Sequence, residues 1–134
     1  MHDHTSMKEV PVLKDASREG PIPSEWRPVF RAIVKAFAQG DFKLSSGIPG
    51  VSPVSDDDAV GNRGYVAKYG ETLTELSDDT WKSSVCIWSD LSGKWDTLVD
   101  LWTVREGRSD LVLQTFVTES NGGYQFHIHM VYVP

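Results

Sequence analysis

Cysteine, long apolar runs and positive charge are all scarce in this chain. Cys86 is its only cysteine, so no disulfide can form within the chain. No stretch reaches the roughly 18 apolar residues of a membrane-spanning helix, and residues 1–4 have neither the basic start nor the apolar core of a secretory signal. With 13 Lys and Arg against 19 Asp and Glu, the net charge is −6, which argues against a broad basic face. We therefore expect a cytoplasmic protein with no cofactor and with neither nucleic acid nor membrane as a partner.

The length and composition are those of one folded domain. At 134 residues the chain can bury roughly two-thirds of its unfolded surface without a metal or disulfide. Residues 1–22 mix charges with prolines and a glycine and show no sustained period, which predicts a poorly ordered N-terminal arm. Residues 23–134 are expected to form a single α+β domain.

Tryptophans mark the part of the chain that we expect to form hairpins. Four of them lie seven residues apart: Trp81, Trp88, Trp95 and Trp102. Such a heptad would suit a coiled coil, but residues 85–87 and 98–99 favour strand and residues 89–94 favour a turn. The spacing therefore indicates β-hairpins and says little about chemistry.

An amphipathic helix is predicted over residues 24–39, and a second, short helix over residues 56–69. The first has apolar residues at helical spacing: Trp26, Val29, Phe30, Ile33, Val34 and Phe37. Ser24 is its candidate N-cap, and Gly40 is placed to end it in a left-handed conformation. The second helix lies between Ser55 and Gly70, and its two internal glycines weaken it by roughly 1 kcal/mol each relative to alanine.

The rest of the chain predicts an antiparallel meander. Strands are expected near residues 72–76, 83–89, 95–104, 111–119 and 124–133. Asn121-Gly122 between the last two is a strong signal for a two-residue hairpin. In the final strand, Tyr124, Phe126, Ile128, Met130 and Tyr132 alternate with Gln125, His127, His129, Val131 and Val133, and we expect the first set to face the helix. The predicted fold is one long amphipathic helix packed on a sheet of four to five strands, plus the short helix.

Extending the registers predicts a polar row across the face away from the helix. A two-residue loop at 121–122 opposes His129 to Gln114, and a three-residue loop at 106–108 opposes Gln114 to Asp100. A four-residue loop would instead bury the Asp100 carboxylate in apolar surroundings, at a cost of several kcal/mol. Apolar residues flank the row in two further expected rows: Trp102–Val112–Val131 and Leu98–Phe116–His127.

Three interpretations of this face remain open. His127 and His129 could share a metal with Asp100 or Gln114 as a further ligand. Alternatively, Asp100 could orient His129 as a general base, although no serine or cysteine is aligned with that pair. In the third, the face is too apolar to stay bare and is covered by residues 56–69, a second copy of the chain or a protein partner. Its binding residues would be Leu98, Trp102, Val112, Gln114, Phe116, His127 and Val131.

The chain also resembles a family of short, uncharacterised bacterial proteins. The resemblance rests on Tyr69-Gly70-Glu71-Thr72-Leu73, Trp81, Leu98–Thr103 and Ser109–Leu113, and the similar region runs from about Trp26 to the terminal Val131–Pro134. It implies a bacterial cytosolic source and no reaction, because the shared residues are typical of strands and turns. The order of helix and sheet is similar, at the level of fold alone, to cystatin-like and nuclear-transport-factor-like proteins.

From the sequence we expect a small acidic interaction protein that uses the outer sheet face. Its partner would be another protein or a second copy in a homodimer, and an immunity-like or regulatory role is compatible with this expectation. The alternative is a small-ligand-binding protein or enzyme with a polar site at Asp100, Gln114, His127 and His129.

Overall fold

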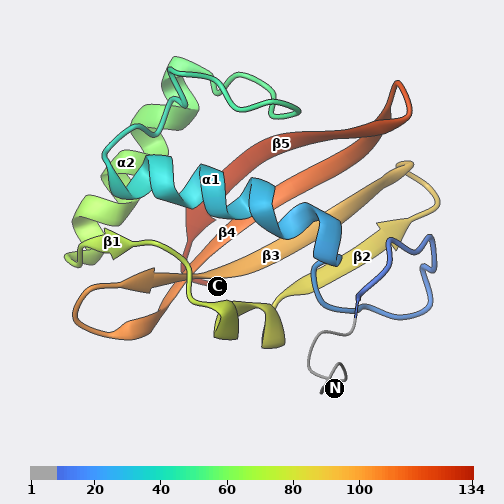
Figure 1. The fold of residues 1–134 in the computed structure, drawn as a ribbon. Helices are drawn as coiled ribbons and strands as arrows, with labels where there is room; N and C mark the ends of the chain where they lie inside the picture. The colour runs from blue at the N-terminus through green and yellow to red at the C-terminus, as the bar shows by residue number, and fades with distance from the viewer. Residues whose placement is uncertain (1–8) are drawn as a thin grey trace, which may run out of the picture.

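Helix α1 (Arg27–Ala38) lies across one face of a five-stranded antiparallel sheet, as the computed structural model shows (Figure 1). The strands are β1 (Leu73–Thr74), β2 (Val85–Ser89), β3 (Lys94–Thr103), β4 (Gly107–Ser120) and β5 (Gly123–Tyr132), and the second helix is α2 (Asp56–Tyr69). Short 3₁₀ turns, η2 (Ser24–Trp26) and η3 (Asp78–Lys82), precede α1 and β2. The structure describes residues 9–134, so residues 1–8 of the predicted arm lie outside the described residues. The predicted α+β class is confirmed.

The sheet departs from a simple meander at one edge. Strands β2 to β5 pair consecutively, and β1 also pairs with β3, through Leu73–Thr103 and Thr74–Trp102. β1 and β2 therefore both lie along the same edge of β3, at its opposite ends. The opposite edge of the sheet is formed by β5.

α1 forms where the apolar stripe predicts it and packs that stripe into the core. Phe30, Ile33, Val34 and Phe37 of this 12-residue helix are at most 2% exposed, and so is Trp26 of η2 just before it. Gly40 follows with φ of +87°, as predicted for the residue that ends the helix.

The expected N-cap at Ser24 is wrong. No side chain caps the start of η2; the Ser24 hydroxyl instead accepts a hydrogen bond from the Val10 N–H (2.8 Å). Pro28 lies in the first turn of α1 and removes one of the N–H groups that would lack a partner there. Ser24 thus binds the N-terminal segment rather than the helix.

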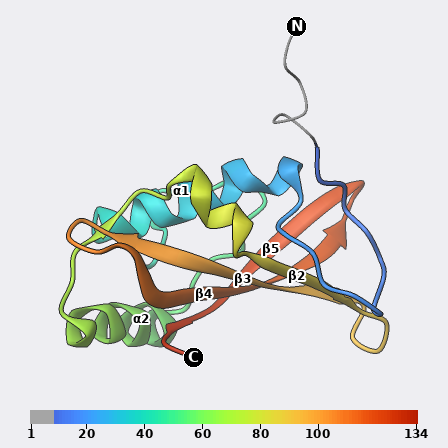
Figure 2. The ribbon, with the colours of Figure 1, turned by 90° about the horizontal axis from the view of Figure 1, so that it is seen from below.

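α2 has the predicted bounds, but at 14 residues it is no shorter than α1. The Ser55 hydroxyl accepts from the Asp58 N–H (3.1 Å), and Gly70 ends the helix with φ of +89°. α2 lies beside β5, where the Asn62 side-chain oxygen accepts from the Val131 N–H (3.0 Å). These contacts cover the open edge of β5, as Figure 2 shows for the end of the strand nearest the C-terminus.

The hairpin between β4 and β5 is confirmed, but its predicted register holds only over the first half. Ser120 faces Gly123 as expected, and the pairing continues to Thr115 and Ile128. A bulge then adds one residue to β5, so Gln114 faces Met130 and not His129. Because one extra residue reverses which side chains face inward, Val131 is buried in the core at 1% exposure. The expectation that Val131 lies on the outer face is wrong.

The register between β3 and β4 also differs from the prediction. The turn occupies residues 104–106, with Thr103 facing Gly107. Along the body of the hairpin, Leu98 faces Gln114 and Asp100 faces Val112. The register is shifted by two residues, and a shift of two leaves each side chain on its predicted face of the sheet. Asp100 stays off the core side, while Thr97, Val99 and Leu101 are fully buried.

Residues 9–23, which we call the strap, lie along the β2 side of the sheet (Figure 2). Gly20 exchanges two backbone hydrogen bonds with Cys86, and the Leu13 carbonyl accepts from the indole N–H of Trp95 (2.9 Å). The described part of the predicted arm, residues 9–22, thus has defined partners on β2 and β3.

Candidate functional site

The sheet face away from α1, called the outer face below, carries large apolar side chains. Its rows run Asp96–Phe116–His127, Leu98–Gln114–Met130 and Asp100–Val112–Tyr132. Leu98, Phe116 and Met130 are half-buried. Val112 is 6% exposed yet stays outside the cluster of buried residues that α1 shares, so its neighbours on the outer face bury it. Within residues 9–134, no helix lies across this face over β2, β3 and β4 (Figures 1 and 2).

Polar groups surround Phe116 on the outer face. The Lys94 ammonium lies 4.1 Å from the centre of the Phe116 ring, and the His129 ring centre lies 5.2 Å from it. The side-chain amide of Gln114 donates to both oxygens of Asp96 (3.0 and 3.3 Å). The face therefore combines an apolar centre with charged groups held by specific contacts.

Trp102 lies on β3 with Leu98 and Asp100 but, unlike them, contacts the core cluster. It is half-buried and packs against the core cluster. A side chain at Gly107 would begin 3.6 Å from the Trp102 ring, which shows how closely the indole covers that glycine. Its indole N–H is buried without a partner among the described residues.

The predicted polar row of Asp100, Gln114 and His129 does not form. The Asp100 carboxylate accepts from the Ser83 hydroxyl (2.5 Å), Gln114 binds Asp96, and His129 packs on Phe116. The bulge in β5 moves His129 out of line with Gln114. Asp100 therefore does not orient His129, and the predicted acid–base pair of these two residues is wrong.

His127 is instead the centre of a hydrogen-bonded cluster, which we call the clasp: Ser52, Thr118, Gln125 and His127. The Ser52 hydroxyl lies 3.0 Å from Nδ1 of His127, and the Thr118 hydroxyl lies 3.1 Å from Nε2. The Gln125 amide donates to the Ser52 oxygen (3.0 Å). All four residues are half-buried.

The donors of the clasp allow an arrangement in which Ser52 donates to His127. Gln125 uses an N–H on Ser52, which leaves the hydrogen of the Ser52 hydroxyl free to point at Nδ1 of His127. A neutral imidazole with a bare Nδ1 carries its proton on Nε2, and that N–H then donates to Thr118. In this arrangement the Ser52 hydroxyl and both ring nitrogens of His127 have partners.

Ser52 could not be predicted as a site residue, because no local sequence pattern links it to His127. Ser52 is 75 positions from His127 and follows a loop rich in glycine and proline. It reaches β5 through a parallel bridge between Val51 and Phe126, in which the Ser52 N–H donates to the Phe126 carbonyl (2.8 Å). No hydrophobic period predicts a single bridge of this kind.

Metal and membrane features are absent from the described part of the chain. Among residues 9–134, no three His, Cys, Asp or Glu side chains gather closely enough to hold a metal ion. His127 uses both ring nitrogens in the clasp. No helix in this range combines the length and apolarity needed to span a membrane.

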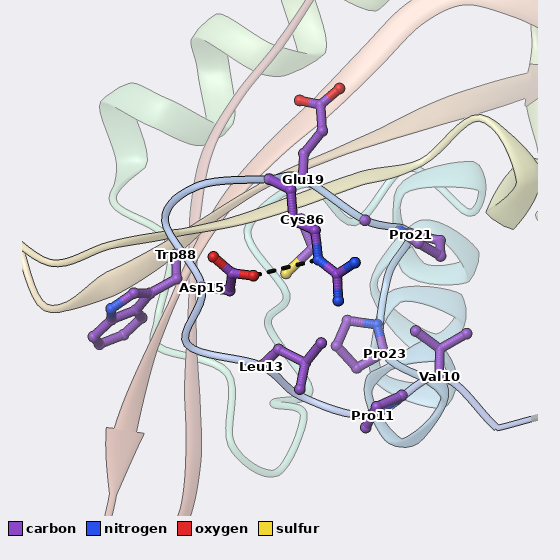
Figure 3. Close-up of a pocket in the computed structure, with 11 residues that line it drawn as sticks. Val10, Pro11, Leu13, Asp15, Glu19, Pro21, Pro23, Cys86 and Trp88 are labelled. Atoms are coloured by element: carbon purple, nitrogen blue, oxygen red, sulfur yellow. Dashed lines mark ion pairs between the residues drawn. The ribbon is translucent and has the colours of Figure 1, made fainter.

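A pocket of about 270 Å³ lies between the strap and β2. Figure 3 shows Leu13, Pro21 and Pro23 around it, with the Cys86 thiol at its base. Burial, together with the charge of Asp96, raises the pKa of this thiol to about 12. The thiol is therefore protonated at neutral pH and is a poor nucleophile.

Comparison with known proteins gives a family but no activity. Neither the curated proteins nor the solved structures include a match to the chain. A family model described as a domain of unknown function, DUF7668, matches residues 34–134, from the second half of α1 to the end of β5. Because this match covers most of the chain and all five strands, the protein belongs to the DUF7668 family, as the resemblance to an uncharacterised family predicted.

Proposed function

We propose that the chain is a binding domain that engages another protein through its outer face. The observation that carries the proposal is the set of large apolar side chains left half-exposed there, with Leu98 and Phe116 at its centre. Large exposed apolar patches on soluble proteins commonly mark interaction sites. Aromatic side chains ringed by polar groups are typical of the central contacts of an interface.

Charge favours a basic partner over a second copy of the chain. The net charge is −6, so two copies repel each other while a basic partner is attracted and steered. Asp96 and Asp100 lie in the outer-face rows, where they accept hydrogen bonds from the uncharged side chains of Gln114 and Ser83. The expectations of a bacterial, cytoplasmic protein and of an immunity-like or regulatory role remain predictions, and a homodimer is an outcome of the test below.

Position-specific photo-crosslinking in the native cells tests the proposal. A photoreactive phenylalanine derivative replaces His129, an exposed residue that packs on Phe116, or Leu91, which is fully exposed in the turn between β2 and β3. We expect a discrete product from position 129 and none from position 91. Leu98→Asp should abolish the product, because it places a charge at the centre of the contact.

The control for Leu98→Asp is Val60→Asp, which adds the same charge at a 69% exposed position on α2. The Val60→Asp variant should keep the product. Equal products from positions 91 and 129, or a product that survives Leu98→Asp in a folded protein, would contradict the proposal. A product with the mass of two chains would identify a homodimer.

A further inference from the structure

We propose a second property, independent of partner binding: the clasp is a site for acyl transfer that cleaves esters with a small aliphatic acyl group. Ser52 is the nucleophile, His127 the general base, and Thr118 the residue that positions the base. Gln125 supplies a hydrogen-bond donor beside the nucleophile.

The distances in the clasp meet the geometric requirements for nucleophilic catalysis. A nucleophile and base must lie within about 2.6–3.2 Å, with a third group orienting the base. Ser52 and His127 are 3.0 Å apart, and Thr118 lies 3.1 Å from the second ring nitrogen. In the tautomer that donates Nε2–H to the Thr118 oxygen, Nδ1 is bare and lies against the Ser52 hydroxyl, which is the form a base must have.

Gln125 is placed to act on the carbonyl oxygen of a substrate. Its side-chain nitrogen lies 3.0 Å from the Ser52 oxygen, so a carbonyl carbon bonded to that oxygen brings its own oxygen near the amide. Side-chain amides serve as donors of this kind when negative charge develops on the oxygen. The Ser52 N–H is already bonded to Phe126, which makes the Gln125 amide the donor available.

A pocket beside Ser52 indicates the substrate class. It measures about 340 Å³, and Ser52 forms part of its wall. The remaining wall is mainly apolar, with Leu44, Ile48 and Val51 among its residues. Such a space accepts a short aliphatic acyl group. Lys43 is the one charged residue in its wall, so a charged headgroup would find few partners there.

The reaction balances with water as the co-reactant. The Ser52 oxygen bonds to the ester carbonyl carbon while its proton moves to Nδ1 of His127. The bond from that carbon to the alcohol oxygen then breaks, and the alcohol leaves with the proton from His127. Water attacks the acyl-serine by the same route, which releases the carboxylic acid and restores the Ser52 hydroxyl.

The same bonds could serve only to hold residues 50–52 against β5, and covalent labelling separates the two roles. The full chain is treated with an alkyl fluorophosphonate, and modified peptides are identified by mass spectrometry. We expect an adduct on Ser52. His127→Gln should slow its formation by about 100-fold or more, in line with the contribution of a general base.

Matched variants of the same residue types provide the controls. Ser46→Ala changes an exposed serine of the same loop, and His129→Gln changes the neighbouring histidine outside the clasp; both should label like the original chain. Failure to find a Ser52 adduct on the folded chain overturns the proposal. So does labelling that is unchanged in a folded His127→Gln variant.

Turnover of p-nitrophenyl butyrate tests the positioning role of Thr118. Thr118→Val should lower kcat with little change in KM, because the acyl pocket is untouched, and Thr118→Ser should restore kcat. If the Thr118 hydroxyl were purely structural, Thr118→Val would lower the stability of the fold without changing kcat relative to KM. Hydrolysis that persists in Ser52→Ala would overturn the assignment of Ser52 as the nucleophile.

Discussion

Cys86 shows how position in the sheet sets the chemistry of one side chain. It pairs with Thr97, a fully buried residue, so its thiol points to the side of the sheet that α1 and the strap cover (Figure 3). There, burial and then the Asp96 charge raise the pKa to about 12 from its ordinary 9.0. Its place on the core side of β2 is therefore the physical reason why this thiol is a poor nucleophile at neutral pH.

Cys86 should therefore react slowly until the protein unfolds. At pH 8, a thiol with the raised pKa is ionised on the order of 10³-fold less than an ordinary one. We expect iodoacetamide to alkylate the folded chain slower by about that factor than the chain in urea, as followed by intact mass. Since the folded state favours the neutral thiol, stability should also fall as pH rises between about 9 and about 12. Equal alkylation rates with and without urea would contradict this prediction.

Elements with a strong local pattern could be predicted from the sequence, and β5 shows where that stops. Asn121 and Gly122 have φ of +48° and +80°, the turn that this dipeptide favours. Nothing in the local sequence predicts the bulge beyond Ile128, because the end of the strand offers apolar residues to the core with or without the extra residue. In the observed register, Asn62 on α2 accepts from the Val131 N–H, a contact between residues far apart in the chain.

α2 should gain stability when its internal glycines are replaced. Gly61 and Gly64 are exposed within the helix, and a Cβ at either position meets nothing within 4 Å. Gly61→Ala and Gly64→Ala should each raise the free energy of unfolding by roughly 0.5–1 kcal/mol, measured by urea denaturation. Gly70→Ala is the control and should be destabilising, because φ of +89° at that position strains any residue with a Cβ. A loss of stability in both helix variants would contradict the role assigned to their glycines.

At the scale of the whole molecule, both edges of the sheet are covered by segments that are distant in sequence. The strap pairs with β2 through Gly20, and α2 together with residues 50–52 covers β5. An uncovered edge would invite pairing with other chains. Sequence reasoning found the helices and strands but not these covers or the clasp, because each depends on one or two contacts across the fold rather than on a repeating pattern.

Removing the strap should therefore destabilise the entire domain. A chain starting at Glu19 lacks the Leu13 carbonyl that accepts from Trp95, a side chain that is 1% exposed, and it uncovers the neighbouring Trp88 ring. Loss of a partner for a buried donor costs about 1–3 kcal/mol, and the lost apolar contacts add to that cost. We therefore expect the chain starting at Glu19 to unfold at a lower urea concentration than a chain starting at Glu9. Lys14→Ala removes the exposed ion pair with Glu119 and the cation–π contact with Trp88 but keeps the Leu13 carbonyl, so it should cost about 1 kcal/mol or less. If the chain starting at Glu19 kept the midpoint of the longer one, the strap would be an attachment to the domain and not a part of its core.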